Sequence, residues 1–152
     1  MRSGSIARVT VPARISLVTL GVDDLARATA FYEALGWRRS SASNDEVSFF
    51  ATADGVLALY PFPSLAVDAG LPPGPLPPPG RATLAINVGS EEDVDRVLAE
   101  VAAAGATVPA AASRTAWGGY LGWFSDPDGH LWEVTHNPGF PLDERGSVVL
   151  PA

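Results

Sequence analysis

The chain contains an internal repeat: the segment that begins at Leu20 aligns with the segment that begins at Ile86, an offset of 66 residues. In both copies an apolar run typical of a strand, ISLVTLGV or ATLAINV, leads to a residue that favours a helix N-cap, Asp24 or Ser90. Such self-similarity indicates two copies of one supersecondary unit packed against each other. The fold is therefore restricted to arrangements of two similar modules.

A helix is expected after each of these strands, over residues 24 to 35 and 90 to 104. In both segments apolar residues recur at i, i+3, i+4 and i+7, the spacing of a helix with one buried face. A glycine, Gly36 or Gly105, stands where each helix should end. The matching apolar positions are Ala28, Phe31, Tyr32 and Leu35 in the first helix and Val94, Val97, Leu98 and Val101 in the second.

Short strand-like runs separated by turn residues follow each helix: EVSFFAT, DG and VLALYPF, then GYLGWFS, DPDG and HLWEVTH. Each half is therefore predicted to be βαβββ, and the fold class to be α+β. The expected organisation is an N-terminal extension (1–13), a first module (14–60), a proline-rich linker (61–81), a second module (82–138) and a C-terminal tail (139–152).

The segment 61–81 is expected to be extended, because it holds eight of the 14 prolines. A stiff connector is the simpler interpretation. The alternative is a proline-rich ligand for a recognition module.

Composition narrows the function. The formal net charge of −7 opposes binding to a phosphate backbone, so no nucleic-acid partner is expected. All ten basic residues are Arg and there is no Cys, which excludes a Schiff-base lysine, a thiol nucleophile and a thiolate metal site. No apolar run has the length of a membrane span or a signal peptide core, so we expect a soluble, cytoplasmic protein with no membrane partner.

Two βαβββ modules containing VDDLARATAFYEALGW and FSDPDGHLWEVTHNP resemble the vicinal oxygen chelate superfamily, which includes glyoxalase I, bleomycin-resistance proteins and extradiol dioxygenases. The resemblance spans residues 14 to 138. It implies that each module curls its sheet into half of an open barrel, that the halves enclose a cavity, and that a homodimer is plausible. It also implies, for the metal-dependent members, a divalent ion held by four side chains, one from the first and one from the last strand of each module.

This chain departs from the metal-binding pattern that the resemblance implies. The first-strand positions fall on Leu17 and Thr83, and the last-strand position of module one falls on Ala58 or, in another alignment of the turn, Leu59. Only Glu133 matches. One carboxylate cannot supply the three or more donors that a divalent ion needs, so no metal and no cofactor are expected.

His130 and His136 do not restore a metal site. Each lies three residues from Glu133, and in a strand residues an odd number apart point to opposite faces. Asp126 and Asp128 are better explained by the turn chemistry of DPDG than by calcium.

Three residues remain as candidates for the site, in addition to the barrel positions Leu17, Ala58 and Thr83. Glu133 would be a hydrogen-bond anchor or general base, or it pairs with an Arg as a remnant of a metal-binding ancestor. Trp117, flanked by glycines, would stack on a planar ligand, or it packs under its loop. Tyr120 would direct its hydroxyl toward the cavity. Trp123 and Trp132 are expected in the core.

Two functions follow from the resemblance. The first is metal-free binding of a planar or cationic organic molecule, similar to the drug-sequestering members of the superfamily, with Trp117 as a wall and Glu133 as the anchor. The second is an enzyme, a lyase, isomerase or dioxygenase, that uses a metal or Glu133 as base. A third, different hypothesis is an interaction protein that acts through its proline-rich linker.

Overall fold

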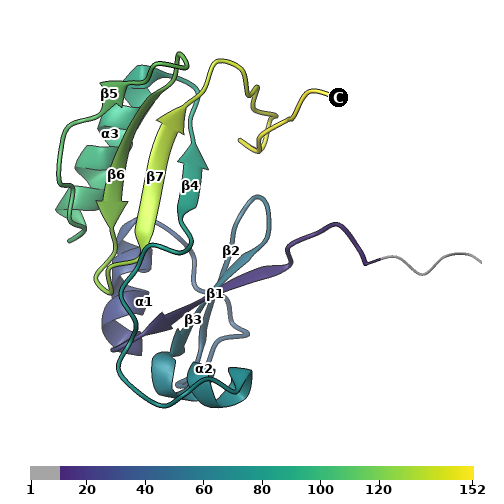
Figure 1. Ribbon diagram of the computed structural model, residues 1–152, viewed down its shortest axis with the longest axis vertical. Helices are drawn as coiled ribbons and strands as arrows, with labels where there is room; N and C mark the ends of the chain where they lie inside the picture. The colour runs from purple at the N-terminus through teal and green to yellow at the C-terminus, as the bar shows by residue number, and fades with distance from the viewer. Residues whose placement is uncertain (1–10) are drawn as a thin grey trace, which may run out of the picture.

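The computed structural model describes residues 11–152, so most of the predicted N-terminal extension lies outside the described residues. Within this range two curved sheets, one from each half of the chain, carry three helices (Figure 1). No helix within the described range is long and apolar enough to cross a membrane. The elements in chain order are β1 (Leu17–Val22), α1 (Leu25–Ala34), β2 (Ser48–Ala51), β3 (Val56–Pro61), α2 (Phe62–Ala69), β4 (Leu84–Asn87), α3 (Glu91–Ala103), β5 (Ser113–Arg114), β6 (Tyr120–Ser125) and β7 (Leu131–His136).

The two sheets have the same connectivity. In the first, the strand order is β1-β3-β2, with β1 parallel to β3 and β2 antiparallel to it. In the second, the order is β4-β7-β6-β5, with β4 parallel to β7 and the other pairs antiparallel. The predicted α+β fold with two related modules is therefore confirmed.

Both predicted helices are present, each shortened by one residue at either end. The side chains of Asp24 and Ser90 cap them by accepting hydrogen bonds from the backbone N–H groups of Arg27 and Asp93 (3.0 and 3.1 Å). The apolar face of each helix packs into one continuous core that spans both modules.

Within residues 11–152 the first module departs from the predicted βαβββ pattern, because it has one strand fewer than the second module. Only an isolated bridge between Arg39 and Phe50 stands where the second module has β5. Residues 38–46, between α1 and β2, read RRSSASNDE and lack the alternating apolar residues that would bury one face of a strand. A polar hydrogen-bonded loop forms there instead, in which the guanidinium of Arg39 donates to Ser48 Oγ (3.1 Å) and to the carbonyl of Asn44 (2.8 Å).

The segment 61–81 differs from the prediction of an extended chain, because its first part forms α2. Pro61 and Pro63 lie at the start of this helix, where the backbone N–H that proline lacks would have no intrahelical partner. Phe62 and Ala66, one helical turn apart, are buried. The Phe62 side chain packs against β1 at Gly21, where an added Cβ would lie 2.8 Å from the Phe62 ring.

Each sheet packs one face against α1 or α3, and the opposite face is called here the inner face; in the first sheet the inner face packs against α2 at Gly21. On β1 and β3, Leu20 and Leu59 are in register and buried in the core with α1. On β7, Trp132 and Val134 occupy the corresponding buried positions on the α3 side. By strand alternation, Thr19 with Ala58 and Ala85 with Glu133 lie on the inner faces.

The DPDG turn between β6 and β7 joins the second module to the first. Tyr32 of α1, fully buried, donates from its hydroxyl to Asp126 Oδ2 (2.6 Å) and accepts from Trp132 Nε1 (3.2 Å). Burial and the neighbouring Asp126 carboxylate raise the pKa of the Tyr32 phenol well above its usual value. Tyr32 therefore stays a neutral donor to a buried carboxylate.

Further contacts surround this hydrogen bond. Asp128 Oδ1 accepts from the backbone N–H of Asp23 (2.9 Å) and from Arg27 (3.1 Å). His130 Nε2 donates to the carbonyl of Gly21 (2.7 Å). The turn thus contacts the end of β1 and the start of α1 at several points, which fixes the relative position of the two modules.

We predict that Tyr32→Phe lowers the free energy of unfolding by about 1.5–3 kcal/mol, because it leaves a buried carboxylate oxygen without its donor. For a domain of this size that corresponds to a fall in Tm of roughly 3–12 °C, measurable by thermal unfolding. Tyr60→Phe is the matched control, because it removes an exposed hydrogen bond to Asp68 (3.0 Å). Equal, small effects of the two substitutions would contradict the assigned role of Tyr32.

Candidate functional site

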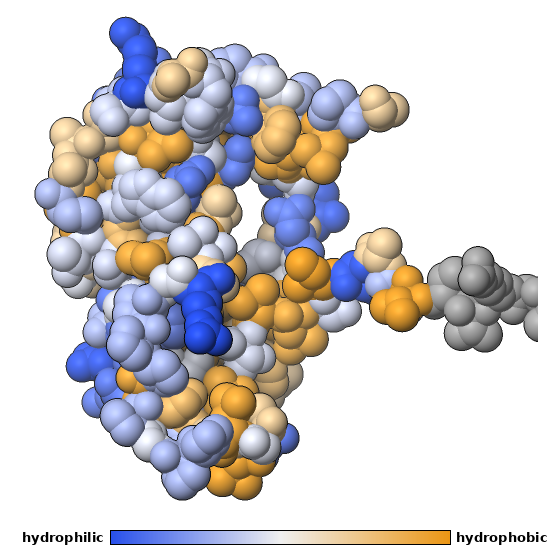
Figure 2. All heavy atoms as spheres, in the orientation of Figure 1, coloured by the Kyte–Doolittle hydropathy of each residue, from blue (hydrophilic) through white to orange (hydrophobic). Residues whose placement is uncertain are grey.

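A cavity of about 670 Å³ lies between the two modules. It runs along the edge strands β1 and β4 and takes residues from both faces of these strands. The β2–β3 turn and the C-terminal tail close its outer side, and Figure 2 shows the molecule hollowed on this side. Its lining is mainly apolar and includes Ile15, Leu17, Val18, Trp37, Ala51, Val56, Leu57, Leu84, Ile86, Trp132 and Val148.

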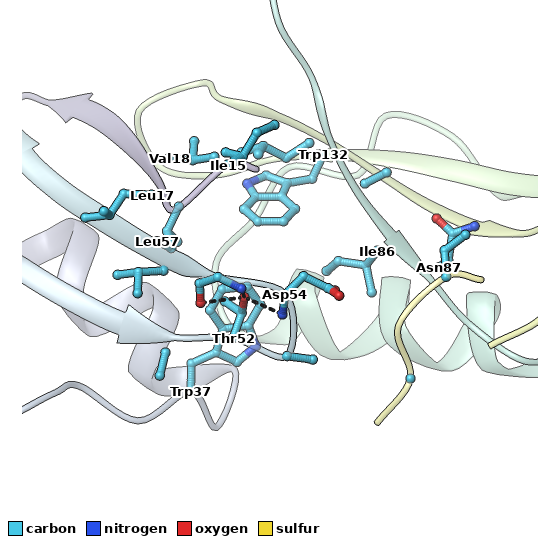
Figure 3. Close-up of a pocket in the computed structure, with 18 of the residues that line it drawn as sticks. Ile15, Leu17, Val18, Trp37, Thr52, Asp54, Leu57, Ile86, Asn87 and Trp132 are labelled. Atoms are coloured by element: carbon cyan, nitrogen blue, oxygen red, sulfur yellow. Dashed lines mark hydrogen bonds between the residues drawn. The ribbon is translucent and has the colours of Figure 1, made fainter. Parts of the chain in front are cut away.

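Two indole rings, one from each module, form an aromatic wall of the cavity. The ring centroids of Trp37 and Trp132 are 5.8 Å apart in an edge-to-face arrangement. Figure 3 shows them between Val18 and Leu57 on one side and Ile86 on the other. Trp132 is held from behind, since it stacks on Phe124 at 5.9 Å and donates to Tyr32.

The position of Trp37 follows from the way α1 ends. Gly36 adopts a left-handed backbone (φ +85°), and the N–H groups of Gly36 and Trp37 donate to the carbonyls of Glu33 and Tyr32 (2.9 and 3.2 Å). This is the Schellman arrangement, in which the residue after the glycine folds back on the helix. Trp37 accordingly packs on Tyr32 and presents its ring to the cavity.

The cavity also contains polar groups. Asp54 stands in the β2–β3 turn, which Thr52 holds by accepting from the N–H groups of Asp54 and Gly55 (3.3 and 3.1 Å). In Figure 3 the Asp54 side chain extends toward Ile86 of β4. Arg38 supplies a charge of opposite sign, and within residues 11–152 neither side chain takes part in an ion pair. Asn87 and Ser16 complete the polar lining.

The strand register locates the four residues that correspond to the family's metal-ligand positions. Thr19 pairs with Ala58 as Ala85 pairs with Glu133, so Ala58 rather than Leu59 is the counterpart of Glu133. Leu17 is half exposed and lines the cavity. Ala58, Thr83 and Glu133 do not line it.

Glu133 lies half-buried on the inner face of the second sheet. Desolvation raises the pKa of its carboxyl group. Within residues 11–152 it forms no ion pair, so the pairing with an Arg considered from the sequence is not observed. Its register partner on β6 is Trp123, which is 36% exposed rather than in the core. Trp132 is in the core, as predicted.

Two other predicted residues lie away from the cavity. Trp117 is 57% exposed, and its ring packs over Gly119, where an added Cβ would collide with it. Tyr120 lies on the α3 side of its sheet and donates to Asp95 (2.7 Å). The ligand-binding roles of Trp117, Tyr120 and Glu133 remain predictions.

The donor set does not fit the metal ion of the metal-dependent relatives. The four family positions hold Leu17, Ala58, Thr83 and Glu133, of which one is a strong ligand. No group of three or more His, Asp or Glu residues within the described part of the chain is arranged to hold a metal. His130 and His136 make hydrogen bonds to the carbonyls of Gly21 and Val88 (2.7 and 3.1 Å).

The sequence analysis missed Trp37, Asp54 and the tail as parts of the cavity. A large apolar residue directly after a helix-ending glycine is a recognisable signal, and it would have placed Trp37 against α1. The contribution of the tail, through Gly146 and Val148, has no comparable local signal.

Comparison with known proteins identifies relatives. The model of the Glyoxalase/Bleomycin resistance protein/Dioxygenase superfamily matches residues 14–134. A glyoxalase-related enzyme from Fulvimarina pelagi is 34% identical with a TM-score of 0.83, covering 93% of this chain and 100% of that one. A lactoylglutathione lyase from Agrobacterium tumefaciens is 25% identical with a TM-score of 0.63, covering 84% and 96%. No curated protein matches the sequence.

We predict that Zn²⁺, Ni²⁺ and Mn²⁺ do not raise the Tm of the protein. A native-state ligand at a hundredfold excess over its dissociation constant would stabilise by about 2.7 kcal/mol, a shift of several degrees. Thermal unfolding with each ion and with a chelator measures the effect. A metal-dependent rise that Glu133→Ala abolishes would refute the conclusion drawn from the donor set.

The raised pKa of Glu133 gives a second prediction. Because desolvation disfavours the ionised carboxyl in the folded protein, Glu133→Gln should raise the Tm at pH 7. The gain should shrink as the pH falls through the raised pKa and should be gone below the ordinary value, where the wild-type carboxyl is protonated in both the folded and the unfolded protein. Glu33→Gln, on the exposed side of α1, is the control. A Tm difference that stays constant with pH would show that desolvation is not its cause.

Proposed function

Because the chain belongs to the Glyoxalase/Bleomycin resistance protein/Dioxygenase superfamily, we propose that it binds a planar aromatic organic molecule in the cavity between its modules, without a metal ion. The supporting observation is the cavity itself, which is mainly apolar and has an edge-to-face pair of indoles as one wall. A concave apolar site of about 300–1,000 Å³ with a few fixed polar groups is the usual form of a small-molecule site. Such a protein sequesters its ligand and needs no chemistry.

The charges in and around the cavity favour a cation over an anion. Asp54, which forms no ion pair within residues 11–152, offers a carboxylate to a positively charged group, and the net charge of −7 repels polyanions. The positive charge of Arg38, which also lines the cavity, favours an anion instead. Both side chains are exposed, so each contributes modestly.

A second candidate function is enzymatic, a lyase, isomerase or dioxygenase reaction with Glu133 as general base. The raised pKa of Glu133 supports it, because a base is most effective when its pKa approaches the working pH. That chemistry would occur at Glu133, which does not line the cavity, so the two candidates place their ligands differently. A homodimer that covers the inner faces, and a cytoplasmic location, remain part of the proposal.

Titration with thioflavin T, a planar aromatic cation whose fluorescence rises when it is held rigid, tests the proposal. Trp37→Leu should weaken binding by about three- to tenfold through the loss of ring contact. Asp54→Asn should weaken it and Arg38→Gln strengthen it, each by up to about fivefold. Circular dichroism confirms that each variant is folded.

Trp117→Ala and Glu133→Gln are the discriminating variants, because both residues lie outside the cavity lining. The cavity proposal expects their affinities to equal that of the wild type. Weakening in these two variants, with Trp37→Leu unchanged, would instead place the ligand at the loop and inner face. Absence of binding by the wild type would count against a site for planar cations.

A further inference from the structure

The C-terminal tail forms a small independent hairpin on the outer side of the cavity. Leu142 and Val148 pair across it, and the N–H of Val149 donates to the carbonyl of Pro141 (2.8 Å). Its turn is tightly specified: Asp143 Oδ1 accepts from the N–H groups of Arg145 and Ser147 (both 2.9 Å), and Gly146 adopts φ +81°. The hairpin, residues 141–149, therefore has its own hydrogen-bonded structure.

One hydrogen bond connects the tip of this hairpin to the tip of the β2–β3 hairpin. Arg145 Nη2 donates to the carbonyl oxygen of Ala53 at 2.7 Å, across 92 residues of sequence. Thr52 organises the receiving turn with three hydrogen bonds to the backbone of Asp54 and Gly55. Two preformed turns thus meet at a charge-assisted contact.

This contact joins the two segments that close the outer side of the cavity, the tail hairpin and the β2–β3 turn. Gly146 and Val148 of the tail hairpin line the cavity, as do Ala53, Asp54 and Gly55 of the opposing turn. In Figure 1 the tail leaves the top of β7 and turns to the right of β4, above the β2–β3 hairpin. Within residues 11–152 no other hydrogen bond or ion pair ties the tail hairpin to the first module.

We propose that Arg145 is a positioning residue for the ligand site: it holds the tail hairpin against the β2–β3 turn, so that the hairpin forms a wall of the cavity and slows ligand release. The inference rests on the proposed function. Arg145 need not touch the ligand; it acts through Gly146 and Val148. Loss of its hydrogen bond frees the hairpin to swing away, which opens the cavity without altering Trp37 or Trp132.

Stopped-flow kinetics with thioflavin T measure this role. Arg145→Ala should raise the dissociation rate by about three- to tenfold, the factor expected for one lost hydrogen bond of modest strength. Arg145→Lys should restore slow release, because its ammonium can also donate to the Ala53 carbonyl. Arg96→Ala removes the same charge from an exposed position on α3, where Arg96 pairs with Asp93 and Glu100, and should leave the rate unchanged.

A ligand-free measurement separates failure of this inference from failure of the proposed function. The chain has no cysteine, so spin labels at Asp54→Cys and Glu144→Cys report the distance between the two turns directly. The distribution should be narrow with Arg145 and broad with Arg145→Ala. A narrow distribution in Arg145→Ala would overturn the inference whether or not the dye binds.

Two further outcomes are decisive. If Arg145→Ala broadens the distance distribution but leaves the dissociation rate of the dye unchanged, Arg145 holds the hairpin in place but the hairpin is not a wall of the ligand site. If the distance distribution is broad in Arg145→Ala but the wild type does not bind the dye, the ligand role of Arg145 and the proposed function are both overturned. The role of Arg145 in holding the hairpin against the β2–β3 turn would still be established.

Discussion

The hydrogen bond between Tyr32 and Asp126 is the contact on which the rest of the structure depends. Asp126 uses one carboxylate oxygen to receive the N–H groups of Asp128 and His130, which shapes the DPDG turn, and the other to receive the Tyr32 hydroxyl. The residue that closes the β6–β7 hairpin therefore also attaches it to α1. β4 pairs with β7, and β1 directly precedes α1. The Tyr32–Asp126 hydrogen bond between α1 and the β6–β7 turn therefore sets the separation of the edge strands β1 and β4, and with it the width of the cavity.

The two copies of the repeat have diverged where the cavity forms. Both helices end in the same Schellman arrangement, but the residue after the glycine is Trp37 in one and Ala106 in the other. Likewise, the β6–β7 turn forms the hydrogen bond between Asp126 and Tyr32 of α1, whereas the corresponding β2–β3 turn forms a hydrogen bond with Arg145 of the tail. A symmetric pair of modules would build two equivalent surfaces. The differences at these positions place Trp37 and Asp54 in the lining of the cavity.

Local sequence signals predicted the elements that depend on local interactions. The caps Asp24 and Ser90 and the apolar faces placed both helices, because a side chain three residues away satisfies the first free N–H groups. The helix α2 was missed, since proline content suggested extended chain while burial of Phe62 stabilises a helix. Trp123 was misplaced because side-chain identity does not reveal which face of a sheet is covered. The cavity depends on contacts between segments such as Arg145 and Ala53, which no local pattern encodes.

The two carboxylates of interest differ in environment, and this difference separates the two candidate functions. Glu133 is desolvated and unpaired within the described chain, a state that disfavours its charge and favours proton exchange. Asp54 is exposed at the cavity, where its carboxylate is available to attract a cation. Replacement of the other barrel positions by Leu17, Ala58 and Thr83 leaves Glu133 without the partners that a metal centre requires. An electrostatic anchor for a bound molecule is therefore better supplied by Asp54, beside the indoles, than by Glu133 on the inner face.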